Sequence, residues 1–216
     1  MSTETNFNCR FCDRPDPERI IAMGDSEYLQ LSLGPLVEGH TMVVTREHYS
    51  CSAETPAEQF DRIFRTGEDA LARLSEIYGS DGGTIFEHGR SGACLPPGHG
   101  DDHCFHAHVH LLPVKVAVTE SIVNRYKIQR LSDWGEVRAT YQQDGKPYLL
   151  TRDASGIAYV ADPQDLPRHY LRSVVAEQFG MPELADWVAF SGYRTIAASI
   201  ERIGTQLADT VKSKTA

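Results

Sequence analysis

The stretch FHAHVHLLP, residues 105–113, alternates histidines with small or apolar residues. This alternation predicts a β-strand, because successive side chains of a strand point to opposite faces. His106, His108 and His110 then share one face, with successive imidazoles ~6.5–7 Å apart, while the apolar residues between them enter a core. Three imidazoles in a row are costly as core packing, so the pattern indicates a functional face.

Three interpretations of this face are open from the residues alone. The face is a solvated, histidine-rich surface, or all three imidazoles bind a metal ion, since histidine is the commonest metal-binding side chain. In the third interpretation one imidazole is a nucleophile. A neutral imidazole suits that role near pH 7, because its unperturbed pKa is ~6.5.

The composition limits the class of protein. The 216 residues include nine histidines, and six of them lie between residues 88 and 110. With 21 basic and 30 acidic residues the formal net charge is −9, which disfavours binding to a nucleic-acid backbone. The 41% hydrophobic and 24% charged content is typical of a soluble globular chain. No apolar run approaches the ~18 residues of a membrane span, and the N-terminus lacks the pattern of a secretory signal, so we expect a cytoplasmic protein without membrane contact.

The N-terminal stretch holds a C-x-x-C pair, Cys9 and Cys12. The same spacing occurs in redox pairs, but a thioredoxin-like motif opens a helix, whereas Pro15 and Pro17 predict a turn here. A metal knuckle is therefore favoured over a redox pair. The other cysteines have no partner at ligand spacing and are interpreted as small structural residues: Cys51, Cys94 and Cys104.

The rest of the chain predicts an α+β fold. Strands are expected at 20–23, 28–33, 40–45, 84–87 and 105–114, and a helix capped by Thr55 is expected to end near Gly79. Beyond residue 117 we expect a hairpin of 146–151 with 157–160, and helices at 168–180 and 193–211. We expect residues 1–116 to form the catalytic domain and residues 117–216 to form an extension packed on it, not an independent domain.

Residues 105–113 resemble the signature of the histidine triad (HIT) superfamily, His-φ-His-φ-His-φ-φ. GHTMVVTREHY, residues 39–49, looks like the family's G-H-x-φ-φ-φ-P-x-x-H strand and turn. The resemblance implies an antiparallel five-stranded sheet with packed helices, usually in a homodimer. It assigns His108 as the nucleophile that attacks phosphorus and His110 as the contact to the phosphate and leaving atom.

The C-x-x-C pair gains meaning from the same resemblance. One branch of the superfamily binds zinc through such a pair, a histidine after the second conserved strand and the first histidine of the triad. The resemblance therefore implies a structural zinc site in this chain. Its ligands would be Cys9, Cys12, His48 and His106.

The segment before the triad departs from the family pattern. Glu87 occupies the family's asparagine position, and the loop of residues 90–103 is longer than usual, with Asp102 and His103 in place of glutamine and serine or threonine. Glu87 is interpreted either as a ligand of a ribose hydroxyl, as a group that orients His108 or acts on the leaving group, or as a strand-end carboxylate paired with an arginine. The predicted substrate-binding residues are Glu87, Arg90, Gly98 and His103.

These expectations combine into one function. The chain is predicted to hydrolyse a nucleoside phosphoryl compound, such as a dinucleoside polyphosphate, nucleotide conjugate or phosphoramidate, through a nucleotidyl-histidine on His108. Nucleotidyl transfer or phosphorolysis through the same intermediate is the first alternative. A noncatalytic protein that binds zinc or a nucleotide is the alternative of another class, and a zinc metallohydrolase with an open metal position is a third.

Overall fold

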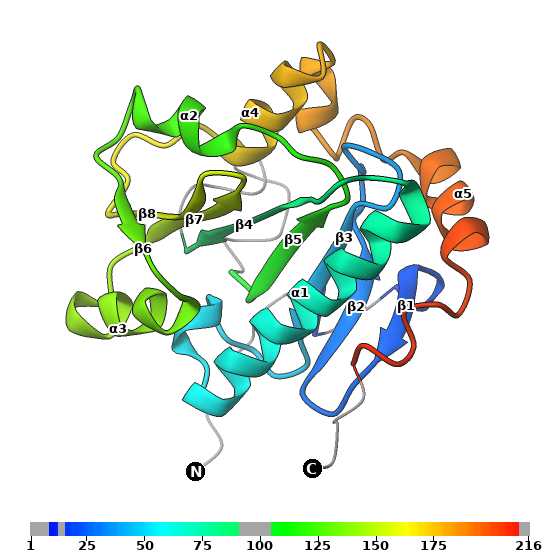
Figure 1. Ribbon diagram of the computed structural model, residues 1–216, viewed down its shortest axis with the longest axis horizontal. Coiled ribbons are helices and arrows are strands. Elements are labelled where there is room, and N and C mark those ends of the chain that lie inside the picture. The colour runs from blue at the N-terminus through cyan, green and yellow to red at the C-terminus, as the bar shows by residue number, and fades with distance from the viewer. Residues whose placement is uncertain (1–8, 13–15, 91–104, 212–216) are drawn as a thin grey trace.

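A computed structural model describes residues 9–12, 16–90 and 105–211. Its centre is one eight-stranded sheet in the order β1-β2-β3-β5-β4-β7-β8-β6, and every neighbouring pair is antiparallel (Figure 1). The strands are β1 (Ile20–Met23), β2 (Glu27–Leu31), β3 (Thr41–Thr45), β4 (Thr84–Gly89), β5 (His108–Leu112), β6 (Gln129–Leu131), β7 (Tyr148–Asp153) and β8 (Gly156–Ala161).

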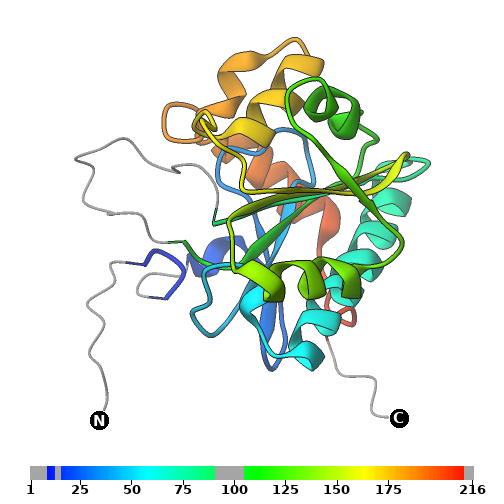
Figure 2. The same ribbon diagram turned by 90° about the vertical axis from the view of Figure 1, so that its left-hand side faces the viewer.

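Helices cover both faces of the sheet. They are α1 (Ala57–Tyr78), α2 (Val118–Val123), α3 (Trp134–Asp144), α4 (Tyr170–Gln178) and α5 (Tyr193–Ile203), with short 3-10 turns η1 (Pro17–Arg19), η2 (Ser52–Glu54) and η3 (Pro182–Ala185). The long helix α1 packs against β3 and β5, whereas α2 contacts β7 and α4 contacts β4. Both views show α2 and α4 together at one end of the molecule, above α1 (Figures 1 and 2). No helix in the described ranges is long and apolar enough to cross a membrane.

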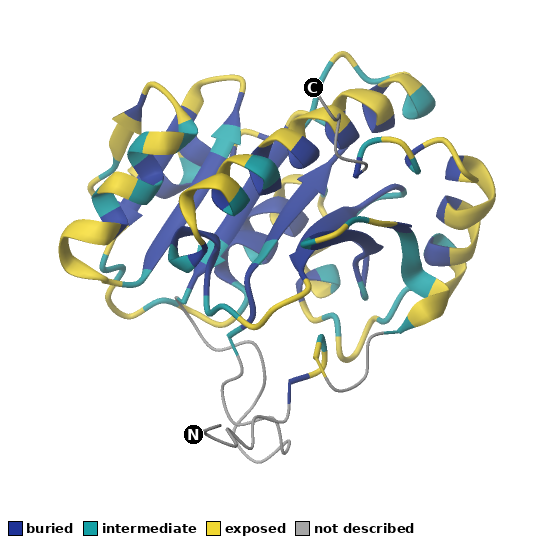
Figure 3. Ribbon diagram, turned by 90° about the horizontal axis from the view of Figure 1, so that it is seen from below, coloured by how far each residue is buried: buried dark blue, intermediate teal, exposed yellow. Residues whose placement is uncertain are grey.

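The two larger hydrophobic cores of the described residues lie on opposite faces of the sheet. One lies under α1 and includes Phe60, Ile85 and Leu111, and the other lies under α4 and includes Phe86 and Leu171. Neighbours along a strand thus enter different cores, as the period of a β-strand requires. The strands at the centre are buried, while the outer faces of the helices are exposed (Figure 3).

The predicted helix after residue 55 is confirmed as α1. Its buried residues recur at helical spacing, and Gly79 ends it in the left-handed conformation, with φ of 68°. The prediction that Thr55 caps this helix was wrong. Pro56 occupies the cap position, and the Thr55 hydroxyl instead donates to the Ser52 carbonyl at 2.7 Å.

The predicted α+β class and antiparallel sheet are confirmed, with eight strands in place of the five expected. The predicted hairpin is β7 and β8, and β7 pairs with β4, so this hairpin extends the same sheet. Two predicted helices are present as α4 and α5, but α2, α3 and β6 were not expected. The division of the chain at residue 116 stays a prediction.

The contact between Gly89 and Tyr148 makes a testable packing site. These residues are cross-strand partners of β4 and β7, and a Cβ on Gly89 would lie only 2.2–2.4 Å from three carbon atoms of the Tyr148 ring. We expect Gly89→Ala to lower the free energy of unfolding by about 1–3 kcal/mol, because the buried ring must shift. Chemical denaturation measures this change. Gly67→Ala is the matched control: Gly67 lies within α1, and a Cβ there would meet the Leu111 side chain at an ordinary contact distance of 3.4 Å. An equal loss of unfolding free energy in both variants would contradict the packing argument.

Candidate functional site

The face of β5 opposite α1 carries two histidines of the triad. His110 pairs across strands with Met42 and with Phe86, and its ring stacks on the Phe86 ring with centroids 4.5 Å apart. The ring centroids of His108 and His110 are 4.9 Å apart, in a T-shaped arrangement. The predicted shared face of these two histidines is therefore present in the structure.

His108 has one ring nitrogen engaged by the backbone. Its Nδ1 lies 2.6 Å from the carbonyl oxygen of His106, so Nδ1 carries the proton and donates it. In the neutral ring Nε2 then holds the lone pair. Burial lowers the pKa of His108, which favours that neutral form. The ring of Phe11, from the C-x-x-C segment, lies 5.3 Å from the His108 ring.

A second hydrogen-bond chain fixes the ring state of His110. The Leu36 amide donates to Nδ1 of His40 at 3.1 Å, and Nε2 of His40 lies 2.9 Å from Nδ1 of His110. Burial holds the pKa of both histidines well below the ordinary value, so both rings are neutral. His40 Nδ1 accepts, so His40 Nε2–H donates to His110 Nδ1. His110 must therefore carry its own proton on Nε2.

The residue that sequence reasoning missed here is His40. It belongs to the stretch 39–49 that resembles the family's strand and turn, but no role was assigned to it. The sequence placed His40 at the start of a predicted strand, but only the structure shows that this strand, β3, lies beside β5.

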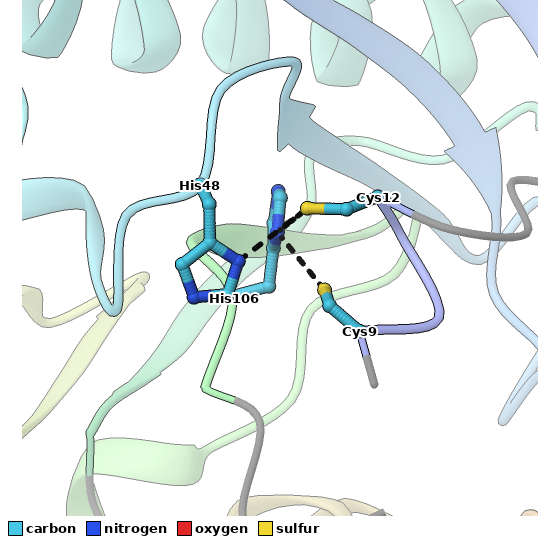
Figure 4. A group of neighbouring side chains, drawn as sticks. All are labelled: Cys9, Cys12, His48 and His106. Atoms are coloured by element: carbon cyan, nitrogen blue, oxygen red, sulfur yellow. Dashed lines mark hydrogen bonds between the residues drawn. The ribbon is translucent and has the colours of Figure 1, made fainter. Parts of the chain in front are cut away.

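The second cluster brings together the four predicted metal ligands, Cys9, Cys12, His48 and His106. One ligand atom from each lies within 4.8 Å of all the others (Figure 4). The Cys9 sulfur is 3.4 Å and the Cys12 sulfur 3.5 Å from Nδ1 of His106, and the Cys12 sulfur is 3.4 Å from Nδ1 of His48. A tetrahedral zinc ion with Zn–S of ~2.3 Å and Zn–N of ~2.0 Å would space such donors about 3.5 Å apart. The donor types and spacings fit a metal ion held by four ligands.

His106 connects this cluster to His108. In the structure β5 begins at His108, so His106 lies just before this strand. The prediction that His106 belongs to the strand was therefore wrong. Nε2 of His106 is 2.8 Å from the Thr45 carbonyl oxygen, so Nε2–H donates there and Nδ1 presents its lone pair to the two sulfurs. This is the usual outer hydrogen bond of a metal-binding histidine. The His106 carbonyl is also the group that orients His108.

Comparison with known proteins identifies the family. The family model described as "Protein similar to CwfJ C-terminal" matches residues 2–127, which is more than half of the chain. The chain belongs to this family. The match spans the triad histidines and all four cluster residues, a group whose side chains could hold a metal ion.

A curated relative and three solved structures are similar to this CwfJ-like chain. Over 201 residues it is 26% identical to "Zinc finger CCCH domain-containing protein 59" of Oryza sativa subsp. japonica. This match covers 83% of the chain and 31% of the relative, so the chain spans about a third of that protein's length.

The first structure is a HIT-like protein involved in cell-cycle regulation from Bartonella henselae, with 14% identity and a TM-score of 0.35; the match covers 44% of this chain and 65% of that chain. A hypothetical histidine triad nucleotide-binding protein from Sulfolobus tokodaii strain7 shows 16% identity, 93% and 97% coverage and a TM-score of 0.38. A Zn-bound histidine triad family protein from Mycobacterium smegmatis shows 20% identity, 60% and 87% coverage and a TM-score of 0.32.

Two predicted substrate-binding residues of the CwfJ-like chain lie away from the triad. Phe86 shares the face of His110, so the next residue, Glu87, points to the opposite face of the sheet. Arg90 also turns away: its guanidinium donates to the Tyr141 hydroxyl at 3.0 Å and lies 3.5 Å from Glu54. Their positions do not support substrate binding. The other two predicted residues, Gly98 and His103, lie outside the described residues.

The Glu87 carboxylate is buried in a polar cluster of its own. It accepts hydrogen bonds from the Ser52 amide at 2.7 Å, the Ser52 hydroxyl at 2.6 Å and the Tyr148 hydroxyl at 2.9 Å. Burial nevertheless raises its pKa to about 7, against the opposing effect of these donors. None of the interpretations of Glu87 made from the sequence described this cluster.

The raised pKa of Glu87 predicts a pH-dependent stability. Below the unfolded pKa of about 4.3 both states are protonated and stability is complete. As pH rises toward 7 the unfolded chain ionises first, so stability is lost until the folded carboxyl ionises as well. Between about pH 5 and pH 8 we expect wild type to lose about 2–3 kcal/mol of unfolding free energy relative to Glu87→Gln. Denaturant titration of both proteins measures the difference, and a constant difference across this range would refute the prediction.

Proposed function

We propose that this protein hydrolyses a nucleoside phosphoryl compound through a covalent nucleotidyl intermediate on His108. The observation that carries the proposal is the hydrogen bond from His108 Nδ1 to the His106 carbonyl. It leaves the lone pair of a neutral imidazole on Nε2, and such a nucleophile suits attack on phosphorus near pH 7.

The reaction divides into two displacements. His108 Nε2 attacks the phosphorus, so a P–N bond forms while the bond from phosphorus to the leaving group breaks. The Nε2–H of His110 is the donor assigned to the phosphoryl oxygen or the leaving atom, where negative charge develops. Water then attacks the phosphorus and gives up a proton to solvent, the P–N bond breaks, and a nucleoside monophosphate leaves with His108 returned to its neutral form.

The metal proposed for Cys9, Cys12, His48 and His106 is zinc. Among the described residues, two thiolates and two imidazoles make up a four-ligand set, which is the pattern of a structural site, and zinc there would join the N-terminal segment to the turn after β3. His106 then serves the metal through Nδ1 and His108 through its carbonyl. Its contribution to the reaction is to hold the backbone that orients the nucleophile.

The proposal also includes the substrate class, the cellular location, the oligomeric state and two further binding residues. The substrate is a small nucleotide, without a nucleic-acid polymer or a membrane. The protein acts in the cytoplasm as a homodimer. Residues Gly98 and His103 contribute to substrate binding from the loop before the triad.

The test is a substrate panel with detection of the intermediate. The purified full chain is incubated with dinucleoside polyphosphates, nucleotide sugars and nucleoside phosphoramidates, and mass spectrometry is used to find an acid-labile nucleotidyl adduct on His108. Release of a nucleoside monophosphate supports hydrolysis. Products that incorporate added phosphate or sugar phosphate indicate phosphorolysis or transfer, and nucleotide binding without turnover or adduct refutes the enzyme in favour of a noncatalytic binding protein.

A further inference from the structure

The turn between β2 and β3, residues 32–40, carries the amide that fixes the ring state of His40. We call this segment the histidine turn. Its ends are joined by the Ser32 amide, which donates to the His40 carbonyl at 2.9 Å. Within it the Leu36 amide donates to His40 Nδ1, and both Leu36 and His40 are fully or almost fully buried. The protonation of His110 therefore depends on the shape of this turn.

Arg172 of α4 reaches this turn from the C-terminal part of the chain. Its guanidinium donates to the carbonyl of Gly34 and lies 3.5 Å from the Ser32 hydroxyl. The same group donates to the carbonyls of Leu184 at 3.1 Å and Ala185 at 3.3 Å in η3. The arginine is only 5% exposed, so these bonds are sheltered from water. The buried guanidinium of Arg172 thus links the histidine turn to α4 and η3.

Other C-terminal contacts hold the turn at two more points. The Gly34 amide donates to the Ser191 carbonyl at 2.8 Å, and the Gly39 amide donates to the Ser199 hydroxyl at 2.9 Å. Gly34 has φ of +60°, and a Cβ there would lie 2.5 Å from the Trp187 Cβ. Residues outside the span of the family model, which ends at 127, therefore clamp a turn that lies inside it.

We propose that Arg172 is a positioning residue that acts through the histidine turn to keep the proton of His110 on Nε2. Holding Gly34 keeps the Leu36 amide on Nδ1 of His40, which makes Nε2 of His40 the donor to Nδ1 of His110. The bonds of Arg172 to the histidine turn thereby keep the Nε2–H of His110 as a donor on the face of β5 where the substrate is proposed to bind. The catalytic consequence rests on the proposed function, whereas the choice of tautomer does not.

Loss of the hydrogen bond from Arg172 to Gly34 has a defined chemical outcome. If the Leu36 amide leaves Nδ1 of His40, the proton of that ring is free to occupy Nδ1. The hydrogen bond between the two histidines then reverses, with His110 Nδ1–H donating to His40 Nε2. His110 would present a lone pair instead of N–H at Nε2, and a lone pair repels a phosphoryl oxygen.

The experiment is ¹⁵N NMR of the histidine rings in the full chain, comparing wild type with Arg172→Met and Arg172→Lys. The wild type should show His110 protonated at Nε2 alone. Arg172→Met should shift the His110 nitrogens toward a mixture of tautomers, and Arg172→Lys should give a smaller shift in the same direction because it keeps the charge and one donor nitrogen. Arg125→Met is the matched control, since Arg125 is an exposed arginine after α2 that stacks on Tyr126; its spectrum should match wild type.

Two outcomes overturn the inference. One is a folded Arg172→Met protein in which His110 keeps the wild-type tautomer. If that variant does not fold, Arg172→Lys provides a milder release of the turn, because one ammonium cannot reach Gly34 and both η3 carbonyls as the guanidinium does, and an unchanged His110 tautomer in that variant overturns the inference equally. On an active substrate, Arg172→Met should lower kcat about tenfold or more while changing KM less, as for a donor that acts in the transition state. A wild type without any turnover would refute the proposed function and leave the tautomer result standing.

Discussion

Replacing His108 by asparagine should lower kcat/KM by about 10⁴-fold or more and remove the nucleotidyl adduct entirely. The asparagine amide can still donate to the His106 carbonyl, as His108 Nδ1 does at 2.6 Å, but it has no counterpart of Nε2. The variant therefore removes the nucleophile while keeping the bond that positions it. Steady-state kinetics on the best substrate of the panel, with mass spectrometry of the quenched protein, measures both effects.

His169→Asn is the matched control for this result. His169 precedes α4 in the left-handed backbone conformation, with φ of 54°, which asparagine tolerates well. Its substitution should leave kcat/KM and the adduct on His108 nearly unchanged. Turnover that survives in His108→Asn would exclude covalent catalysis by this residue. Equal losses in both variants would assign the effect to a general disturbance of the fold.

The parts of the fold that depend on local periodicity were predictable. The alternation in residues 105–113 correctly assigned His108 and His110 to one face and Val109 and Leu111 to the core under α1. The apolar spacing of α1 and the glycine that ends it were also visible, because both signals lie within one element. These predictions need no knowledge of which strands are neighbours.

The predictions that failed depend on how distant segments meet. Glu87 directly follows Phe86, and only the pairing of Phe86 with His110 shows that Glu87 points to the other face. The register of two strands separated by a long loop is not encoded in either strand alone. The helix α3 was missed for a different reason: few of its residues are buried, so its apolar pattern is weak.

The ligand cluster shows what a resemblance adds to local reasoning. Cys9 and Cys12 formed a recognisable knuckle, but nothing in the local sequence linked this pair to His48 in a turn after β3 or to His106 before β5. The structure brings all four together with the spacing of a tetrahedral site. The buried Arg172 had no motif around it, and its contacts come from residues up to 140 positions away.

Removing the metal should cost this protein about 4 kcal/mol of unfolding free energy, which corresponds to a fall in Tm of about 10 °C. The chain has two hydrophobic cores that do not involve the cluster, so we expect it to stay folded, unlike an isolated zinc finger. Turnover should fall as well, because His106 would lose the ligand bond that holds its carbonyl against His108. Chelation followed by zinc addition, monitored by thermal unfolding and activity, measures loss and recovery together.

Cys12→Ser should reproduce the effect of chelation, because serine is a poor zinc ligand. Metal analysis should find one zinc per wild-type chain and less than one in the variant. Cobalt in place of zinc should give a sulfur-to-metal absorption band that weakens with Cys12→Ser. Cys51→Ala is the control: this buried thiol is not a member of the cluster, so its loss should leave metal content unchanged. An active wild-type protein that contains no metal, or a Cys12→Ser protein with wild-type zinc content, would contradict the proposed zinc site and would leave the orientation of His108 to the hydrogen bonds of Thr45 and His106 alone.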